Sequence, residues 1–411
     1  MKIFLPQDYA LIAMLNNWSV PIRRVSILGS TGSIGTQGLE VIDQHPDKFK
    51  VVGLSAGSNV SLLKDQINKF KPEVVSVKDE ESKKKLLETN FDHKFEILVG
   101  KNASAEVAKY PCDVVLNGIT GAAGLLPTLE TLKAGHKLAL ANKESLVIGG
   151  KLVLDLAQEG QIIPVDSEHS ALAQCLRGEK KSEIKKLILT ASGGPFRGKS
   201  TEELKNVTVE QTLNHPTWNM GPVVTINSAS LMNKGLEIIE AHLLFGIEFE
   251  KIDVVVHPQS IIHSMIEFID GSTMAQASPP NMKLPIALGL SWPDRLMNVQ
   301  NPIEWTKSQS WTFENVDDKV FKAINLAKKV GKAAGSAPAA MNAANEECVS
   351  AFIERKISFL SIVEIVEQVI ENHLSGSSFV NNQTLTLEKL LNVDELIRVE
   401  TRKQINNLRK D

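Results

Sequence analysis

One segment near the start of the chain, RRVSILGSTGSIGTQGLEVI over residues 23–42, restricts the possible fold more than any other. It begins as a short apolar strand, turns through three glycines and continues with the apolar spacing of a helix. Glycines let the backbone approach a ligand, and the first turn of a helix offers free N–H groups to a pyrophosphate. The segment therefore predicts a dinucleotide-binding turn, although an ordinary glycine-rich turn would share its composition.

Short apolar runs then alternate with helical or loop segments through about residue 150: KVVGLSAG, EVVSV, FEILVG, DVVLNGITG and HKLALANKESLV. This alternation predicts a parallel, doubly wound sheet, in which ligands bind at the carboxyl ends of the strands. An NAD site usually has an acidic residue after the second strand, where this chain has Ser55 to Asn59. The missing acid favours NADPH.

Length and composition exclude several classes of protein. A chain of 411 residues, 43% hydrophobic and 23% charged, predicts two or three globular domains. Its 45 basic and 48 acidic side chains give a formal net charge of -3, which supports neither nucleic-acid binding nor a polybasic membrane anchor. We expect small-molecule partners and no membrane span, because no run of about eighteen apolar residues occurs. Three cysteines without CxxC spacing predict no disulfide framework and fit the cytoplasm.

Three ionisable residues crowd the segment PVDSEHSA, residues 164–171, directly after a predicted strand. They could belong to a solvated loop. Alternatively, since alternate residues of an extended chain point the same way, Asp166 and Glu168 could direct both carboxylates at one point. Two converging carboxylates either raise each other's pKa or share a cation.

A second polar cluster lies in NSASLMNKGLEIIEAHLLF, residues 227–245, which we predict to be one helix. Ser228, Asn233 and Lys234 together suit a monoester phosphate, unless Asn227 or Ser228 only caps the helix and Lys234 is solvated. Glu237 can share a face with Asn233 and Lys234. If that face meets Asp166 and Glu168, three carboxylates converge as hard ligands for Mg²⁺ or Mn²⁺.

The intervening segments add further candidates. The strand KKLILTASGGPFRG leads into a turn at Ser192, and HPTWNMG, residues 215–221, is either a lid that closes over substrate or a loop that buries Trp218. His215 is either structural or a substrate ligand. DVVVHPQSIIHSMIEFIDGSTMAQ predicts successive strands, in which His257 and His263 would at most support the site from behind. From about residue 317 the spacing predicts helices.

Seven motifs together resemble the 1-deoxy-D-xylulose 5-phosphate reductoisomerases of the non-mevalonate isoprenoid pathway: GSTGSIGTQ, ANKESLV, VDSEHSA, SGGPF, HPTWNMG, SASLMNKGLEIIEAHLLF and HPQSIIHSMI. The resemblance implies an α/β protein with an N-terminal Rossmann-type doubly wound NADPH domain, a central α+β catalytic and dimerisation domain, and a C-terminal α-helical domain. We place these at residues 24–165, 166–290 and 317–411, with a linker over 291–316 and a leader of unknown role over 1–23. A homodimer is expected.

The resemblance also implies the site residues. The divalent cation, Mg²⁺ or Mn²⁺, would be bound by Asp166, Glu168 and Glu237, and these three together with Lys143 would be catalytic. The expected substrate-binding residues are Lys143, Ser167, Glu168, Ser192, His215, Trp218, Ser228, Asn233, Lys234 and Glu237. The expected NADPH-binding residues are Thr31, Gly32, Ser33, Ile34, Gly57, Ser58, Asn59, Asn142, Glu144 and Gly221.

In the family's reaction, the ketose phosphate rearranges to a branched aldehyde phosphate, and NADPH then delivers hydride to give 2-C-methyl-D-erythritol 4-phosphate. This chain departs from many members at three places: Ser58 replaces a basic residue, Pro222-Val223 replaces a basic pair, and Asn227 replaces an aspartate. Two alternatives stay open. One is another Rossmann oxidoreductase, of the semialdehyde or homoserine dehydrogenase type, and the other is a nucleotide-binding protein without catalysis.

Overall fold

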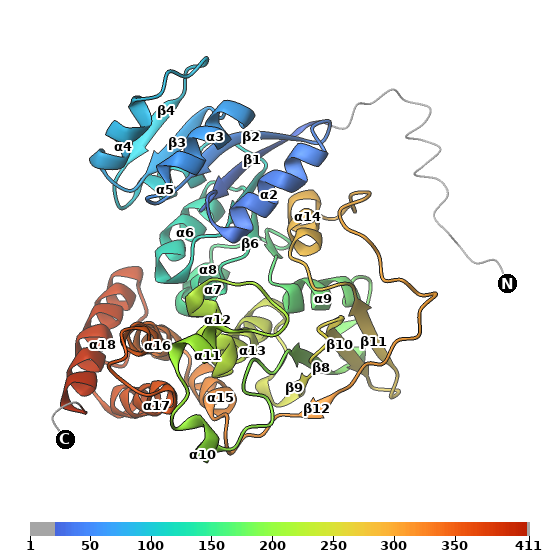
Figure 1. Ribbon diagram of the computed structural model, residues 1–411, viewed down its shortest axis with the longest axis vertical. Helices are drawn as coiled ribbons and strands as arrows, with labels where there is room; N and C mark the ends of the chain where they lie inside the picture. The colour runs from blue at the N-terminus through green and yellow to red at the C-terminus, as the bar shows by residue number, and fades with distance from the viewer. Residues whose placement is uncertain (1–20, 409–411) are drawn as a thin grey trace.

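The computed structural model describes residues 21–408, so most of the predicted leader lies outside the described residues. The N-terminal part is built on a parallel seven-stranded sheet of order β4-β3-β2-β1-β5-β6-β7 (Figure 1). Its strands are β1 (Arg23–Leu28), β2 (Phe49–Ser55), β3 (Val74–Val77), β4 (Glu96–Val99), β5 (Val114–Asn117), β6 (Lys137–Leu140) and β7 (Ile162–Pro164). The predicted doubly wound sheet is confirmed, and its order reverses beside β1, where such sheets bind ligands.

Helices connect these strands, as the alternating pattern predicted. They are α2 (Ser33–Gln44), α3 (Val60–Phe70), α4 (Glu80–Leu87), α5 (Ala103–Lys109), η1 (Gly121–Gly124), α6 (Leu125–Lys133), α7 (Lys143–Gly149) and α8 (Lys151–Leu154). The glycine turn between β1 and α2 is tightly packed. A Cβ added at Gly35 would lie 2.4 Å from the carbonyl oxygen of Gly29, which itself has a φ of +75°. Only glycine allows α2 to begin this close to the strand end.

A second sheet of five strands, in the order β11-β10-β8-β9-β12, forms the middle of the molecule. Its strands are β8 (Ile184–Ala191), β9 (Ile252–Val256), β10 (Ile262–Phe268), β11 (Thr273–Ala277) and β12 (Glu314–Asn315). Only β8 and β9 pair in parallel. Helix α9 (Ser167–Cys175) packs on β10 and β11. The predicted strands of the central α+β region are therefore confirmed.

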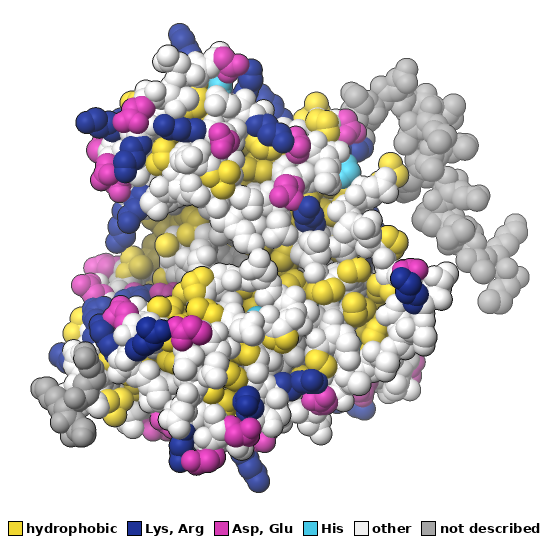
Figure 2. All heavy atoms as spheres, in the orientation of Figure 1, with side chains coloured by type: hydrophobic (Ala, Val, Ile, Leu, Met, Phe, Trp, Pro, Cys, Tyr) yellow, Lys and Arg dark blue, Asp and Glu magenta, His cyan; other side chains and the backbone are white. Residues whose placement is uncertain are grey.

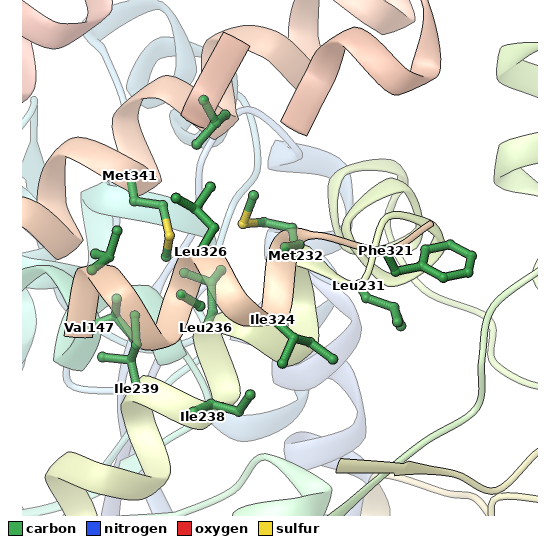
Figure 3. Close-up of a cluster of buried hydrophobic side chains, with 14 of the residues drawn as sticks. Val147, Leu231, Met232, Leu236, Ile238, Ile239, Phe321, Ile324, Leu326 and Met341 are labelled. Carbon is green, nitrogen blue, oxygen red and sulfur yellow. The ribbon is translucent and has the colours of Figure 1, made fainter. Parts of the chain in front are cut away.

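The remaining helices cover this sheet and form the C-terminal region. They are η2 (Lys181–Glu183), α10 (Thr201–Leu204), α11 (Val209–Leu213), α12 (Pro222–Ala229), α13 (Met232–Phe245), η3 (Phe249–Lys251), α14 (Lys283–Ser291), α15 (Ala323–Ala333), α16 (Ala337–Ile353), α17 (Phe359–Ser375) and α18 (Leu387–Asn407). One apolar core joins the central and C-terminal regions. In it Leu236 of α13 lies beside Leu326 of α15 and Met341 of α16 (Figure 3).

Three details differ from the sequence-based predictions. The single helix predicted over 227–245 is wrong, because the chain breaks at Leu231, which has a φ of 59°, into α12 and α13. Helix α14, assigned by prediction to the central domain, packs its Ile286 and Leu290 into the core of the first sheet. The predicted linker contributes β12 to the second sheet. Between residues 21 and 408, the structure contains no helix with the length and apolarity needed to span a membrane.

Candidate active site

Three carboxylates from two distant segments meet at the candidate site. Asp166 follows β7 and occupies the N-cap position of α9 without a side-chain capping hydrogen bond, Glu168 lies in the first turn of that helix, and Glu237 lies within α13. Each offers an oxygen, and these oxygens lie within 4.8 Å of one another. The expected convergence is present, but the expected extended backbone is not. The chain becomes helical at Ser167, so the start of a helix, and not strand alternation, brings the two acids of PVDSEHSA together.

Two lysines lie among these carboxylates. The Nζ atom of Lys143, the first residue of α7, lies 2.5 Å from Asp166 Oδ2 and 2.9 Å from Glu237 Oε1. Lys234 Nζ donates to Glu168 Oε1 at 2.7 Å and also contacts Glu237. Lys143, Lys234 and Glu237 are respectively 8%, 4% and 1% exposed, so these ion pairs are almost removed from water. Interactions between charges are strong in such an environment.

The electrostatic balance favours the charged forms of Asp166 and of the two lysines. Burial, the largest single influence, would raise the pKa of Asp166, but the positive groups around it, Lys143 foremost, together lower that pKa to about 2. The pKa of Glu168 is raised, first by burial and then by the charge of Glu237. Burial opposes the charge of Lys143 and Lys234, yet the neighbouring carboxylates raise the pKa of both. The lysines are therefore ammonium groups at neutral pH.

The donor set of this cluster fits a hard divalent cation. All three groups are carboxylates, which is the ligand type that Mg²⁺ and Mn²⁺ prefer. Asp166 Oδ2 is buried and, although Lys143 lies close to it, no donor meets it in hydrogen-bond geometry. A buried carboxylate oxygen of this kind has a free lone pair for a metal.

Ser192 directly follows β8, on the side predicted to bind phosphate, and forms a hydrogen-bonded pair with His215. His215 Nδ1 accepts from the backbone N–H groups of Thr217 and Trp218, at 3.1 and 2.9 Å. The neutral ring therefore carries its proton on Nε2, which donates to Ser192 Oγ at 2.9 Å. Burial lowers the pKa of His215, which favours this neutral form. The hydroxyl proton of Ser192 consequently remains available to an acceptor outside the pair.

The other predicted phosphate ligands lie on α12 and α13. Ser228 is half-buried in the last turn of α12, so it does not open the long helix as predicted. Asn233 accepts from Lys143 Nζ at 3.0 Å and donates to Glu237 Oε1 at 2.5 Å. Asn233 and Lys234 thus lie directly at the carboxylate cluster. Ser167 lies beside it, where its hydroxyl donates to Glu168 Oε2 at 2.5 Å.

The loop that contains Trp218 lies against β10. The indole Nε1–H donates to Ser260 Oγ at 3.4 Å, and the ring meets that of His263 edge-on at 6.2 Å. Trp218 is half-buried, so the alternative of a fully buried tryptophan is not what the structure shows. Ser260 has a φ of 51°, and sequence reasoning missed it. His257 Nε2 accepts from the N–H groups of Ile261 and Ile262, a structural role consistent with support from behind.

The predicted NADPH-binding residues lie along the carboxyl edge of the first sheet, except for Gly221 at the start of α12. Thr31, Gly32 and Ser33 form the turn into α2, and Asn59 caps α3 by accepting from Leu62 N–H at 3.2 Å. Figure 2 shows the surface hollowed between this part of the molecule and the rest.

Two further predicted cofactor residues, Asn142 and Glu144, stand where α7 begins. Asn142 caps α7 through Ser145 N–H at 2.7 Å, while its own amide donates to Gly121 O at 3.1 Å. Burial raises the pKa of Glu144, the next residue but one. Ile34 and Gly57 complete the edge, and nothing lies within 4 Å of a Cβ added at Gly57.

A buried pair behind the carboxylates was missed by sequence reasoning. His169 Nδ1 lies 3.1 Å from Glu240 Oε2, and both side chains are fully buried. The other ring nitrogen, Nε2, donates to the backbone carbonyl oxygen of Glu237 at 2.8 Å. Burial raises the pKa of Glu240 to about 7. The three-residue spacing from Glu237 to Glu240 on one helix was the available signal.

A doubly wound sheet whose carboxyl edge faces buried carboxylates and lysines is typical of an oxidoreductase. Family models agree: "1-deoxy-D-xylulose 5-phosphate reductoisomerase" matches residues 25–150, its C-terminal domain matches 162–245, and "DXP reductoisomerase C-terminal domain" matches 277–400. The chain belongs to the 1-deoxy-D-xylulose 5-phosphate reductoisomerase family.

Individual relatives support this assignment over nearly the whole chain. The 1-deoxy-D-xylulose 5-phosphate reductoisomerase of Cutibacterium acnes is 53% identical over 390 residues, which covers 91% of this chain and 96% of that protein. A solved structure of DOX-P reductoisomerase in complex with NADPH, fosmidomycin and magnesium is 36% identical, with a TM-score of 0.87 over 94% of this chain and 99% of that one. The enzyme from Zymomonas mobilis in complex with NADPH is 38% identical, with a TM-score of 0.86 and the same coverage.

Proposed function

We propose that this chain catalyses the NADPH- and divalent-cation-dependent conversion of 1-deoxy-D-xylulose 5-phosphate to 2-C-methyl-D-erythritol 4-phosphate. One observation carries the proposal beyond family membership: the oxygens of Asp166, Glu168 and Glu237 lie within 4.8 Å of one another beside two buried lysines. A semialdehyde or homoserine dehydrogenase has no need of such a cluster, and a binding protein would not have to retain it.

The proposed metal ligands are these three carboxylates. When bound, Mg²⁺ or Mn²⁺ would stabilise negative charge that develops on substrate oxygens. Lys143, which is charged and lies between Asp166 and Glu237, would donate hydrogen bonds to the same oxygens. His169 would keep Glu237 in place through the backbone carbonyl of that residue. These roles make Lys143 and the three carboxylates the proposed catalytic residues.

The substrate phosphate would bind to Ser192, Ser228, Asn233 and Lys234. Lys234 supplies one buried positive charge, and the three other residues supply neutral donors. The His215 Nε2–H bond to Ser192 Oγ directs the serine proton toward a phosphate oxygen. Ser167, whose hydroxyl donates to Glu168, would contact the substrate beside that carboxylate.

Trp218 would cover the bound substrate. Its anchorage on Ser260 and His263 provides a definite position for a loop that excludes water from the aldehyde intermediate. The cofactor would lie along the residues from Thr31 to Ile34, Gly57 to Asn59, Asn142, Glu144 and Gly221. No acidic side chain follows β2 at residues 56–59, so the position of the ribose 2′-phosphate is free of a negative group. This supports NADPH over NADH.

The test is turnover with product identification. The purified chain, NADPH, 1-deoxy-D-xylulose 5-phosphate and Mg²⁺ should give oxidised cofactor and 2-C-methyl-D-erythritol 4-phosphate, followed by absorbance and by mass spectrometry. Aspartate semialdehyde with NADP⁺ and inorganic phosphate, and homoserine with NADP⁺, serve as comparison substrates. Oxidoreduction of those compounds without reaction of the ketose phosphate would contradict the proposal, and so would NADPH binding without any turnover.

We further propose that the chain works as a homodimer through its central region. Strand β11 is an edge strand of the second sheet, and the segment that follows α14 runs past it (Figure 1). Large apolar side chains are exposed there, among them Met274, Met297 and Trp305, at 41%, 79% and 68%. An unpaired strand edge beside exposed apolar groups is typical of an interface. Location in the cytoplasm stays a prediction.

A further inference from the structure

Helix α16 of the C-terminal region contacts both sides of the candidate site. Its segment NAANEE, residues 342–347, has no part in the chemistry proposed above. Glu346 extends toward the loop that follows β5, on the cofactor side. Asn345, on the same helix, extends toward α12, on the substrate side. A single helix outside both sheets therefore connects two surfaces that a reaction between substrate and cofactor must hold together.

On the cofactor side, Glu346 holds a tight turn. Glu346 Oε1 accepts from the backbone N–H of Ala122 at 3.3 Å. The preceding Gly121 has a φ of +72°, and a Cβ there would lie 2.7 Å from the same oxygen, so both the backbone and the contact require glycine. Asn142, a proposed cofactor contact, donates to the carbonyl oxygen of Gly121 at 3.1 Å. The turn is therefore fixed between Glu346 and Asn142.

The carboxylate of Glu346 is itself fixed by the C-terminal helices. Asn342 Nδ2, one helical turn earlier, donates to Oε1 at 2.9 Å. Arg398 of α18 donates to Oε2 at 2.6 Å and is held in turn by Asp394 at 2.7 Å. Arg398 and Glu346 are only 22% and 24% exposed, which limits screening of this ion pair by solvent. The helices thus present Glu346 at a defined position.

On the substrate side, Asn345 forms a buried amide pair. Its Nδ2 donates to Asn227 Oδ1 at 3.0 Å, and the two side chains are 1% and 3% exposed. Asn227 directly precedes Ser228 in the last turn of α12. This hydrogen bond therefore sets the position of the helical turn that presents a proposed phosphate ligand.

We propose that α16 positions the two halves of the active site independently, with Glu346 placing the Gly121 turn against the cofactor and Asn345 placing Ser228 against the substrate phosphate. The inference rests on the proposed function. Neither side chain need touch a reacting molecule, so both are positioning residues. Their effects should separate: the Glu346 contact acts on cofactor affinity, and the Asn345 contact acts on the KM for the sugar phosphate.

The experiment compares four variants of the full chain. Glu346→Ala should raise the dissociation constant for NADPH about tenfold, the effect of losing one hydrogen bond to a charged acceptor, and leave the substrate KM nearly unchanged. Asn345→Ala should raise the substrate KM by a similar factor and leave the dissociation constant for NADPH nearly unchanged. Glu346→Gln keeps an acceptor for Ala122 N–H and should retain most of the NADPH affinity. Glu347→Ala is the matched control. Glu347 is next to Glu346 on α16 and likewise forms ion pairs with α18, through Arg402 and Arg398.

NADPH affinity is measured by fluorescence titration, KM by steady-state kinetics and folding by thermal unfolding. Equal NADPH dissociation constants for Glu346→Ala and Glu347→Ala would overturn the proposed role of Glu346 at the cofactor. If Glu346→Ala or Asn345→Ala changes the NADPH dissociation constant and the substrate KM in proportion, α16 only stabilises the protein. If Glu346→Ala does not fold, Glu346→Asp, which withdraws the carboxylate by one methylene, is judged by the same criteria. A wild-type chain that binds NADPH but does not turn over the sugar phosphate would instead overturn the proposed function.

Discussion

At the scale of single residues, the site depends on groups whose hydrogen-bonding state is set by their neighbours. The two backbone N–H groups on His215 Nδ1 decide which ring nitrogen holds the proton, and thereby direct the hydroxyl of Ser192. Similarly, the positive groups around Asp166, Lys143 foremost, keep it ionised in a position where burial alone would favour its protonation. Each proposed role follows from such a contact and can be tested by removing it.

The Ser192→Ala variant tests the phosphate side. It removes a neutral donor to the phosphate and should raise the substrate KM by about tenfold, while kcat and the dissociation constant for NADPH stay close to wild-type values. Steady-state kinetics with varied sugar phosphate measure the effect. Thr190→Ser, on the strand that leads to Ser192 but bonded to the backbone carbonyls of Ile262 and His263, is the control. An unchanged KM would remove Ser192 from the phosphate site.

Stability below neutral pH should depend on His263, because burial lowers the pKa of its imidazole from 6.5 to about 4. Above pH 6.5 the ring is neutral in both folded and unfolded chains, so it contributes no pH dependence there. As the pH falls from 6.5 toward 4, the unfolded chain binds a proton that the folded chain does not. The free energy of unfolding should therefore fall by about 2 kcal/mol between about pH 7.5 and pH 5.

Urea unfolding of wild type and His263→Gln at both pH values measures this contribution. The variant should lose about 2 kcal/mol less stability on acidification than the wild type does. Equal losses in the two proteins would show that His263 is not held neutral by its surroundings.

At the scale of elements, the helices, strands and turns that were predicted correctly are those with a local sequence pattern. The strands of the first sheet were predictable because apolar runs alternate with helical segments, and the turn from β1 into α2 because its glycines are needed sterically. The break between α12 and α13 was not predictable, because no glycine or proline marks Leu231, and packing of this 4%-exposed side chain fixes its backbone. The start of α9 at Ser167 was likewise hidden within a polar segment.

The candidate site likewise has features that the sequence could predict and features that it could not. The spacing of Asn233, Lys234 and Glu237 on one helix could be derived from sequence. Their meeting with Asp166 and Glu168, about seventy residues away, could only be stated as a condition or taken from the family resemblance. The contact of Ser260 with Trp218 depends on long-range packing that no local pattern contains, and for Glu240 the only local signal was its spacing from Glu237.

The Gly35→Ala variant tests the glycine turn as an element. Its Cβ would fall 2.4 Å from Gly29 O and 2.5 Å from Ser30 Cα, both of them backbone atoms that cannot rotate away. The turn must shift, which should lower stability by about 1–3 kcal/mol and weaken NADPH binding. Thermal unfolding and NADPH titration measure both effects. Gly57→Ala, where the added methyl meets nothing within 4 Å, should keep wild-type stability, and equal unfolding of the two variants would contradict the packing argument.

At the scale of the whole molecule, exposed apolar side chains beside β11 predict self-association. Light scattering after size-exclusion chromatography should give twice the chain mass of 45.0 kDa. Replacing Met274 and Trp305 with lysine should shift the protein toward the monomer, because charges would then be buried in the interface. The same replacement at Leu408, which is 56% exposed and lies near the C-terminal end of the chain, is the control for loss of an apolar surface residue. A monomeric wild-type protein at micromolar concentration would contradict the dimer.

The proposed reaction needs two parts of the molecule together. The first sheet supplies the edge proposed to bind the cofactor, while α9 and α13 bring the three carboxylates next to Lys143. The central claim is that these carboxylates hold a divalent cation on which turnover depends. The most direct test measures NADPH oxidation with 1-deoxy-D-xylulose 5-phosphate, with added Mg²⁺ or Mn²⁺ and with a chelator, in wild type and Glu237→Gln. We predict metal-dependent oxidation in wild type and a loss of at least about a hundredfold in the variant, with NADPH binding retained. Undiminished oxidation in the chelator, or in Glu237→Gln, would contradict the account.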